Sequence, residues 1–576
     1  MDKRTVVAIV LIGLIIILYP LYLKLIGVAP KEPTEQEEVV RQPKVEPKIE
    51  KIDEKITSPP EEPRQLFISV TEAEPETVTI ESDLFRGTIN SKGAVLTSWE
   101  MKPRLRNVDQ QNWVSLLPTV MEKGALGITI PASGYEIDLD ELNFETQDES
   151  LFLDSSNPQD SLSFKAETEE GLKVVKVFSF HHRRHTIGLR VIIEGASALS
   201  EGRQYILWWK PGLNTTEKKR NDDLRAFAAY AMLGDELIKT RIGGDGAIKD
   251  SSFTGNTKWI AMQTKYFLMA MMTPEDVVGR GVKFRAYYEK GNEEQETLEQ
   301  RIISTGLYMP LQEGMCDHSW EIYLGPMDYF VLKDYGIGLE RMVNLGFKYI
   351  RWIGLIILHL FVNIYRIIPN YGVVIIIFSI VVKIIFYPLT RKSFESMRKM
   401  QDIQPEISKL REKYKSDPAR LNKETLALYR KYKINPASGC FPMLLQMPVF
   451  IALYAVFRNT IELRGESFLW IKDLSAPDTV FHLPMKLPIY GDAFNILPII
   501  MAVTMFIQQK ISMRDPKQAY MVYMMPIFLF FLFNNFSSGL VLYWTLFNLL
   551  TILQENRRRR RQPSETTSPA KDKDKS

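Results

Sequence analysis

The chain has 576 residues, of which 45% are apolar, and a formal net charge of +3. The length allows three or four domains, while two cysteines exclude a disulfide framework and offer no metal-ligand spacing. Charged, proline-rich and apolar blocks alternate along the sequence, which is typical of a membrane protein with a large soluble part.

The first 65 residues contain an apolar run followed by a proline-rich segment. Val6–Ile26 is about long enough to span a bilayer, and Lys3 and Arg4 precede it. A cleaved signal peptide would have a shorter apolar region and a cleavage site with small residues, so we expect an uncleaved anchor whose N-terminus lies inside. Pro30–Arg64 holds seven prolines among Glu and Lys and predicts a semi-extended tether.

Between about Leu66 and Met327 the pattern changes to an alternation of apolar and polar residues. The stretch YEIDLDELNF places Tyr135, Ile137 and Leu139 on one face and acids on the other, and LKVVKVFSF continues the theme. Short runs of this kind, broken by Gly, Asn, Asp and Pro, predict many antiparallel strands and hence a β-sandwich.

The β region carries few signs of chemistry. The segment HHRRH contains His181, His182 and His185, which form a candidate metal site, but a turn or a strand edge is the better interpretation. The sequence of this region contains no nucleophile elbow, phosphate loop or metalloprotease signature. We expect Cys316 outside and Cys440 near or in the membrane, so the two thiols should not pair.

Further apolar segments of membrane-spanning length fill the C-terminal part of the chain. They are Tyr371–Leu389, Phe441–Ile461, Phe494–Ile511 and a pair within Tyr520–Ile552. The polar stretch NNFSSG, Asn534–Gly539, divides that pair by a tight turn. Together with the N-terminal anchor, these segments predict six spans.

Basic residues set the expected orientation of the spans. The loop Arg391–Lys433 carries thirteen basic and six acidic residues, a net charge of +7. With six spans, this loop, the N-terminus and the other basic segments all fall on one side, which the positive-inside rule makes the inside. A seventh span at Trp352–Ile368 would separate them, so Gly336–Asn370 is expected to be an amphipathic helix in the interface. The other basic segments are Lys510, Arg514, Lys517 and Arg557–Arg561.

The basic loop shows helical periodicity on both sides of Ser416-Asp417-Pro418. Asp417 is a predicted N-cap with Pro418 at the first helical position, and Pro436 and Gly439 should end the second helix. The sequence thus predicts a basic helical hairpin inside. It is either a solvated, membrane-hugging charge cluster or a docking site for ribosomal RNA, a nascent chain or a partner.

Lys383 is a charged residue inside an otherwise apolar run. Ser379 lies four residues before it and Tyr387 four residues after it, so the three share one helical face. One interpretation is that Lys383 reaches toward the inner interface with its long side chain. The other is that its helix lines a polar cavity open to the inside, since a charge within a span is costly and usually functional.

The other spans favour the cavity, because each carries a weak polar stripe. None of the last five spans holds an Asp, Glu or His in its middle, which excludes the relays of proton and ion pumps. Inverted repeats typical of secondary transporters are not evident in the sequence. The polar residues of these spans are Gln446, Thr504, Gln508, Tyr543, Thr545, Asn548 and Thr551.

Three stretches resemble the YidC/Oxa/Alb family of membrane protein insertases: YPLTRKSFESMRKMQDIQPEI, LALYRKYKINPASGCFPMLLQMPVFIALY and SSGLVLYWTLFNLLTILQ. The resemblance covers roughly Tyr371–Gln554, and the anchor, tether and outer β domain agree with the architecture of the Gram-negative members. It implies insertion and folding of inner-membrane proteins, alone or beside the Sec translocon. It also implies a hydrophilic groove that opens to the cytoplasm and to lipid, a supersandwich-like β domain, and no chemical catalysis.

The resemblance also assigns roles to a few residues. The charge of the family's groove, usually arginine, falls on Lys383, so positive charge is kept while the planar fork is lost. Ser379 falls where a small hydroxyl residue lines the groove, and Tyr543 and Trp544 fall on an aromatic pair of the last span. The expected client-groove residues are Lys383, Ser379, Tyr387, Gln446, Thr504, Gln508, Tyr543, Trp544 and Asn548.

The expected protein is thus a polytopic α-helical inner-membrane protein with six spans, a five-helix insertase core and a large periplasmic β-sandwich domain. Both termini are expected in the cytoplasm. Nascent membrane-protein clients, the Sec translocon, the lipid bilayer and the ribosome are the expected partners, without a cofactor or metal. The expected segments are an anchor (1–27), tether (28–65), periplasmic domain (66–327), interfacial helix (336–370), second span (371–390), basic hairpin (391–437), third span (438–462), periplasmic loop (463–492), fourth span (493–511), cytoplasmic loop (512–519), fifth span (520–535), sixth span (539–555) and basic tail (556–576).

Two alternatives belong to other functional classes. The same groove would suit a small-solute transporter or channel, for which solute flux without any client would be the sign. The outer β domain would suit a scaffold that binds envelope glycans, and its deletion would then abolish the main activity.

Overall fold

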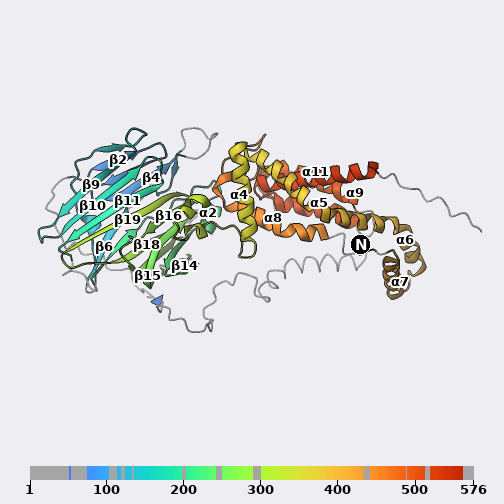
Figure 1. The fold of residues 1–576 in the computed structure, drawn as a ribbon, viewed down its shortest axis with the longest axis horizontal. Helices are drawn as coiled ribbons and strands as arrows, with labels where there is room; N and C mark the ends of the chain where they lie inside the picture. The colour runs from blue at the N-terminus through green and yellow to red at the C-terminus, as the bar shows by residue number, and fades with distance from the viewer. Residues whose placement is uncertain are drawn as a thin grey trace, which may run out of the picture. The chain divides into compact units, whose positions relative to one another are not determined.

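The computed structural model describes residues 51–52, 74–102, 113–118, 124–132, 135–196, 203–241, 249–289, 300–432, 434, 441–487, 490–512 and 519–561. The predicted anchor lies outside these residues, as do Cys440 and most of the predicted tether. The described chain contains a strand-rich region before Met327 and a helix-rich region after it (Figure 1).

The strand-rich region is one hydrogen-bonded network of strands β1 to β19. Its strands pair antiparallel, except that β2 and β8 run parallel. The short helix α2 (Arg220–Ala226) precedes β13. The strands are β1 Lys51–Ile52, β2 Thr77–Glu81, β3 Phe85–Asn90, β4 Val95–Met101, β5 Val114–Ser115, β6 Ala125–Ala132, β7 Tyr135–Asp138, β8 Ser150–Phe152, β9 Gln159–Glu167, β10 Lys173–His181, β11 Thr186–Glu194, β12 Gln204–Trp209, β13 Ala228–Leu233, β14 Glu236–Thr240, β15 Lys249–Gln263, β16 Phe267–Met272, β17 Gly279–Glu289, β18 Gln300–Pro310 and β19 Met315–Pro326.

Strand β10 shows why this sequence forms strands. Its buried and half-exposed positions alternate, so Val174 and Phe178 enter the core while their neighbours do not. It pairs with β9 on one side and β11 on the other, and residues 182–185 make the turn into β11. The turn predicted for the HHRRH segment is therefore confirmed.

The helix-rich region contains nine described α-helices and one two-stranded ribbon. The turn predicted at Asn534–Gly539 is confirmed, because one helix ends at Phe533 and the next begins at Ser538. Helix α11 packs against α5, α8 and α9 (Figure 1). The elements are α3 Tyr329–Asp334, α4 Arg351–Ile367, α5 Tyr371–Asp402, α6 Gln404–Lys413, α7 Pro418–Lys431, α8 Phe441–Asn459, β20 Thr479–Leu487, β21 Gly491–Asn495, α9 Leu497–Ser512, α10 Ala519–Phe533 and α11 Ser538–Arg561.

One described segment, Tyr371–Pro388 of α5, is both long and apolar enough to cross a membrane. The apolar helices Leu497–Ile511 and Val522–Phe533 are shorter than that. At 1.5 Å per residue, such 12- to 15-residue segments are about 18–23 Å long, against a hydrocarbon thickness of about 30 Å. The described helices therefore do not by themselves establish six spans.

The helix predicted over 336–370 is shorter in the structure, where it begins only at Arg351. Gly338 and Gly346 have positive φ angles of 86° and 101°, and this conformation interrupts an α-helix. The 3-10 turn Leu339–Met342 occupies part of the preceding segment instead. The prediction of one continuous interfacial helix from residue 336 was wrong.

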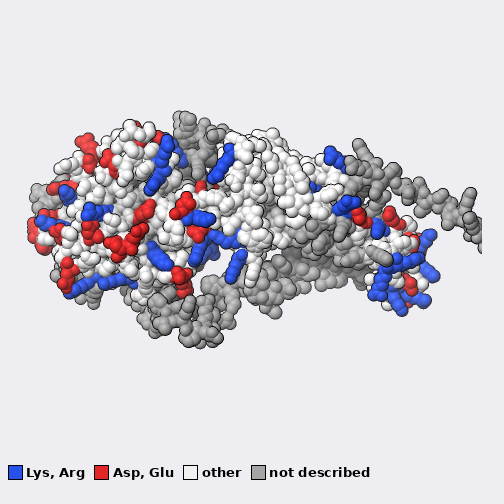
Figure 2. Space-filling view, in the orientation of Figure 1, with Lys and Arg blue, Asp and Glu red and all other residues white. Residues whose placement is uncertain are grey.

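The predicted N-cap of the basic hairpin is confirmed. The side chain of Asp417 accepts a hydrogen bond from the backbone N–H of Arg420 at 3.0 Å, and Pro418 is the first residue of α7. Lysine and arginine side chains gather over α6 and α7, beside a largely uncharged helical surface (Figure 2). Within the helix-rich region, the charge is thus concentrated beyond the end of α5 (Figure 2).

Candidate functional site

Helices α5 and α11 bring Lys383 into contact with two side chains of the last helix. The Lys383 ammonium donates a hydrogen bond to the Thr551 hydroxyl at 2.7 Å and lies 4.4 Å from the centre of the Phe547 ring. Phe547 and Thr551 are four residues apart, so they form one patch on α11. Lys383 is half-buried at this contact.

Exposure rises along the α5 stripe that contains Lys383. Ser379 is fully buried, Lys383 is half-buried, and Tyr387 is 43% exposed. The Ser379 hydroxyl donates to the backbone carbonyl of Ile375 at 2.7 Å, which satisfies it within its own helix. The stripe therefore runs from the interior of the helical region toward the end of α5 that carries the basic hairpin.

Tyr543 and Trp544 are neighbours in α11 but contact different helices. Tyr543 is fully buried, and its hydroxyl accepts a hydrogen bond from the Gln446 amide at 3.2 Å. The Trp544 ring packs against Phe450 at 5.0 Å and Phe533 at 5.7 Å, measured between ring centres. Tyr543 therefore belongs with the polar side chains, whereas Trp544 packs between α8 and α10.

Helices α9 and α11 meet at a second polar contact. The Asn548 amide lies 3.5 Å from the Thr504 hydroxyl, and Thr504 also donates to the carbonyl of Met501 at 2.8 Å. Both side chains are buried, while Gln508, one turn further along α9, is half-buried. The contact therefore joins a hydroxyl of α9 to an amide of α11.

Five of the nine residues predicted for the groove take part in these three contacts: Lys383, Gln446, Tyr543, Thr504 and Asn548. Ser379, Tyr387 and Gln508 lie on the same helices outside the contacts, and Trp544 packs between α8 and α10. The sequence reasoning omitted Phe547 and Thr551, which contact Lys383, from the predicted site. Thr551 was already visible as a polar residue of the last span. Phe547 lies one helical turn before it, so helical spacing from Thr551 was the signal that could have found it.

The strand-rich region holds a buried charge that the sequence reasoning also missed. Lys176 is fully buried, and its ammonium donates to the carbonyls of Gly93, Ala94 and Leu126 at 2.7, 3.2 and 3.0 Å. These three residues have positive φ angles of 75°, 44° and 68°, a strained conformation for Ala and Leu. Burial lowers the pKa of Lys176 to about 8. The signal was alternation in LKVVKVFSF, which places Lys176 among inward-facing residues.

Two carboxylates accompany this lysine. Asp140 accepts a hydrogen bond from the Ile128 backbone N–H at 3.0 Å and also pairs with Lys210. Lys210 makes a second ion pair with Asp138 at 3.1 Å. Burial raises the pKa of the Asp140 carboxyl, although the nearby Lys210 and Lys176 charges oppose the shift. The cluster joins β6, β10 and β12 and serves to hold the fold.

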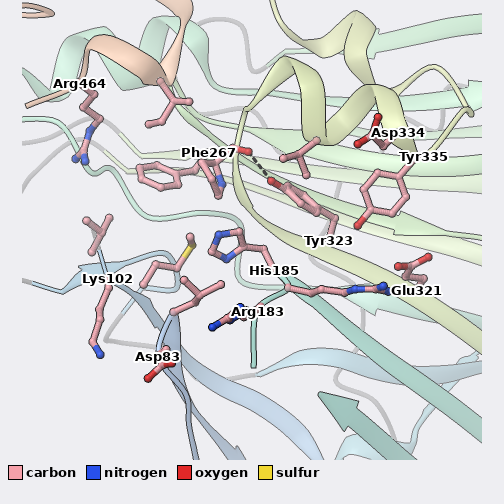
Figure 3. Close-up of a pocket in the computed structure, with 17 residues that line it drawn as sticks. Asp83, Lys102, Arg183, His185, Phe267, Glu321, Tyr323, Asp334, Tyr335 and Arg464 are labelled. Atoms are coloured by element: carbon pink, nitrogen blue, oxygen red, sulfur yellow. Dashed lines mark hydrogen bonds between the residues drawn. The ribbon is translucent and has the colours of Figure 1, made fainter. Parts of the chain in front are cut away.

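A cavity of about 820 Å³ lies where the strand-rich region meets α3 and the segment after α8 (Figure 3). Its wall carries both charge signs, including Lys102, Arg183, Glu321 and Asp334. Across the part of the chain that the structure describes, no group of three or more His, Cys, Asp or Glu side chains could hold a metal ion.

Comparison with known proteins gives matches over nearly all of this architecture. The family model "YidC periplasmic domain" matches residues 77–360, and "60Kd inner membrane protein" matches residues 363–565. The membrane protein insertase YidC of Chlorobium phaeovibrioides is 34% identical over 496 residues, covering 85% of this chain and 84% of the relative. The protein of the same name from Chloroherpeton thalassium is 31% identical over 575 residues, covering 96% and 95%.

A solved structure is also similar. The crystal structure of an active YidC insertase with its first transmembrane domain resolved covers 84% of this chain and 93% of that chain, with 18% sequence identity and a TM-score of 0.37. The names of these relatives give no support to a small-solute transporter. On the strength of the two sequence relatives, the chain belongs to the YidC family of membrane protein insertases.

Proposed function

We propose that the protein inserts and folds integral proteins of the inner membrane, and that its clients contact polar side chains of four helices. These side chains, here called the polar track, are Lys383 of α5, Gln446 of α8, Thr504 of α9 and Asn548 of α11. The observation that carries this proposal is the setting of Lys383. Its ammonium contacts a hydroxyl and an aromatic ring, both on side chains that can rotate away. A client segment with acidic or polar groups can replace such contacts without breaking the backbone of the fold.

The track acts by reducing the cost of moving polar groups into hydrocarbon. An unpaired backbone or side-chain polar group costs several kcal/mol in a lipid environment. The hydrophilic part of a client is held at Lys383, Gln446, Thr504 and Asn548, while its apolar part moves along the outer helical faces into lipid. No covalent bond forms or breaks, so the protein is not an enzyme.

The orientation follows from the basic segments. The α6–α7 hairpin and the arginine-rich end of α11 lie in the cytoplasm with both termini. The strand-rich region is then the periplasmic domain, built as a two-layer sandwich around its hydrophobic core. Helices α5, α8, α9, α10 and α11 with the N-terminal anchor make six spans, and α4 lies in the interface, where Trp352 and Ile356 are exposed.

The basic hairpin receives clients from the cytoplasm. Its exposed lysines and arginines suit contact with ribosomal RNA or with acidic segments of a nascent chain (Figure 2). The Sec translocon is a further partner, beside which the insertase accepts multi-span clients. Strand β21 ends at Asn495 and α9 begins at Leu497, so the fourth span starts at Leu497 and not at the predicted residue 493. The other domain boundaries are those predicted from the sequence.

Depletion of the protein is the direct test of this function. Single-span clients that do not require Sec should accumulate uninserted when the protein is depleted, as measured by protease protection of their outer segment. Normal insertion under depletion would contradict the proposal. A photo-crosslinker at position 383 should capture a ribosome-bound client stalled during insertion, whereas a crosslinker at exposed Val278 of the periplasmic domain should not.

A further inference from the structure

The ribbon formed by β20 and β21 carries several exposed apolar side chains. Val480 and Phe481 are consecutive in β20, at a point where its register with β21 shifts, and both are exposed. Met485, further along the strand, is 65% exposed. A two-stranded ribbon is at best marginally stable in water, and clustered exposed apolar groups indicate contact with lipid or protein.

The ribbon is fixed to the start of α9. Asp478, the residue before β20, is buried, and its carboxylate accepts hydrogen bonds from the backbone N–H groups of Ile496 at 3.2 Å and Leu497 at 2.7 Å. Strand β21 ends at Asn495 and α9 begins at Leu497. Both ends of the ribbon therefore meet at the first turn of this helix.

The ribbon is also fixed to the end of α10. The Asn534 amide, one residue after α10, donates to the carbonyls of Tyr490 at 3.0 Å and Ala493 at 3.1 Å. The Asn495 amide in turn donates to the Asn534 side-chain oxygen at 2.9 Å. Asn495 and Asn534 are fully buried. These contacts hold β21, from the turn at Tyr490 to its last residue Asn495, against the ends of two apolar helices.

The lengths of those helices place the ribbon at the edge of the hydrocarbon. Helix α9 has 16 residues and α10 has 15, so each is about 23 Å long, against a hydrocarbon thickness of about 30 Å. The ends of both helices therefore lie within or at the boundary of the apolar layer. Leu469 and Trp470, in the loop before the ribbon, are also exposed, and Trp is enriched at this boundary.

We propose that the β20–β21 ribbon inserts its apolar side chains into the outer leaflet of the bilayer, as a second interfacial anchor beside α4. The proposal rests on the six-span orientation proposed above. The occupant is lipid, because β21 is held at membrane depth. Charge contributes little: His482 and Asp492 lie 3.7 Å apart and offset each other when the histidine is protonated, and Lys486 is the other charged residue in the sequence of the ribbon. A single lysine adds about 1 kcal/mol of attraction to an anionic surface. Insertion should therefore not require anionic lipid.

Site-specific fluorescence tests the proposal on the full chain. Single cysteines at Val480 and Met485, in a background with Cys316→Ala and Cys440→Ala, are labelled with an environment-sensitive dye in phosphatidylcholine–phosphatidylethanolamine vesicles. The control is Val278→Cys, whose parent side chain is 57% exposed against 55% for Val480. Lipids with a nitroxide near the headgroup should quench both ribbon dyes at least about twofold more than the control dye, as expected for interfacial burial. Added phosphatidylglycerol should not change the result.

The outcomes separate this proposal from the orientation on which it rests. Water-like emission without quenching at both ribbon positions would overturn it. Apolar emission without nitroxide quenching would also overturn it, since the ribbon would then contact protein, either a second copy or another partner. In cells, an impermeant thiol reagent should reach Val278→Cys from the periplasm. Labelling of this control from the cytoplasm alone would instead overturn the orientation.

Discussion

The strand-rich and helix-rich regions each contain a lysine that is wholly or partly buried, and the partners of the two ammonium groups differ. Lys176 is fully buried, and its partners are three backbone carbonyls that belong to a tight, strained part of the fold. Lys383 is half-buried, and it contacts the side chains of Thr551 and Phe547. Backbone carbonyls cannot leave without unfolding, but side chains can rotate. The first arrangement suits a structural cation, and the second suits a cation that meets successive clients.

The largest expected effect is on the structural lysine. Replacement of Lys176 by Met leaves three buried carbonyls without their donor and should lower the free energy of unfolding of the periplasmic region by about 3–5 kcal/mol. Thermal unfolding in detergent, read by limited proteolysis of this region, measures the change. The matched control is Lys173→Met on the same strand. Its exposed ion pair with Glu167 should be worth less than about 1 kcal/mol.

A Lys176→Met protein as stable as the control would contradict the structural role. Lys176 would then resemble Lys383, because neither lysine would stabilise the fold. Insertion activity of this variant, measured below its unfolding temperature, should stay near that of the wild type.

The pH dependence of stability tests the same contact more finely. Burial lowers the pKa of Lys176 to about 8 from an ordinary value of 10.5. Between these values the unfolded chain holds a proton that the folded chain has released, so the stability due to Lys176 rises with pH. The total gain is about 3 kcal/mol at 1.36 kcal/mol per pKa unit. The stability gap between wild type and Lys176→Met should widen between about pH 8 and about pH 10.5.

A gap that stays constant over this range would show that the three carbonyls keep the ammonium charged. The pKa would then not be lowered, although the structural role would stand. A gap that narrows would require a raised pKa and would contradict the effect of burial.

The next effect concerns Lys383. Lys383→Glu reverses the charge that meets acidic client segments and should reduce insertion of a single-span client by at least about tenfold, or about 1.4 kcal/mol. Lys383→Arg keeps the charge and should retain most activity. Wild-type insertion by the Glu variant would remove the charge mechanism. Insertion of a client whose acidic residues are replaced by Asn and Gln should be reduced much less by Lys383→Glu.

The two lysines also differ in how far the sequence alone could reveal them. Lys383 was visible because a charge stands out in an apolar run of membrane length. Lys176 occupies an inward-facing position of the alternation in β10, but the alternation does not show which groups would accept hydrogen bonds from a buried ammonium. Its partners Gly93 and Leu126 are 83 and 50 residues away in the sequence, and such long-range contacts are not encoded in any local pattern.

The same distinction applies to the fold. The strand-rich texture, the turn before β11, the break between α10 and α11 and the Asp417 cap were predicted, because each depends on neighbouring residues. The start of α4 was not predicted, because the apolar residues near Gly338 and Gly346 follow a helical pattern. The positive φ angles of these two glycines nevertheless prevent a helix there. The sequence also did not show which of Tyr543 and Trp544 faces the polar side chains, because this depends on how α11 packs against α8 and α10.

The smallest expected effect separates Tyr543 from Trp544. Tyr543→Phe removes the hydroxyl that accepts from Gln446, and it should cost about 1 kcal/mol in insertion, or about fivefold, since a neutral hydrogen bond contributes this much. Trp544→Phe is the control. Its indole N–H is buried and has no hydrogen-bond partner among the described residues, so a phenyl ring keeps the contacts with Phe450 and Phe533. If instead only Trp544→Phe reduced insertion, Trp544 would be the residue on the client track, and the assignment drawn from these contacts would be reversed.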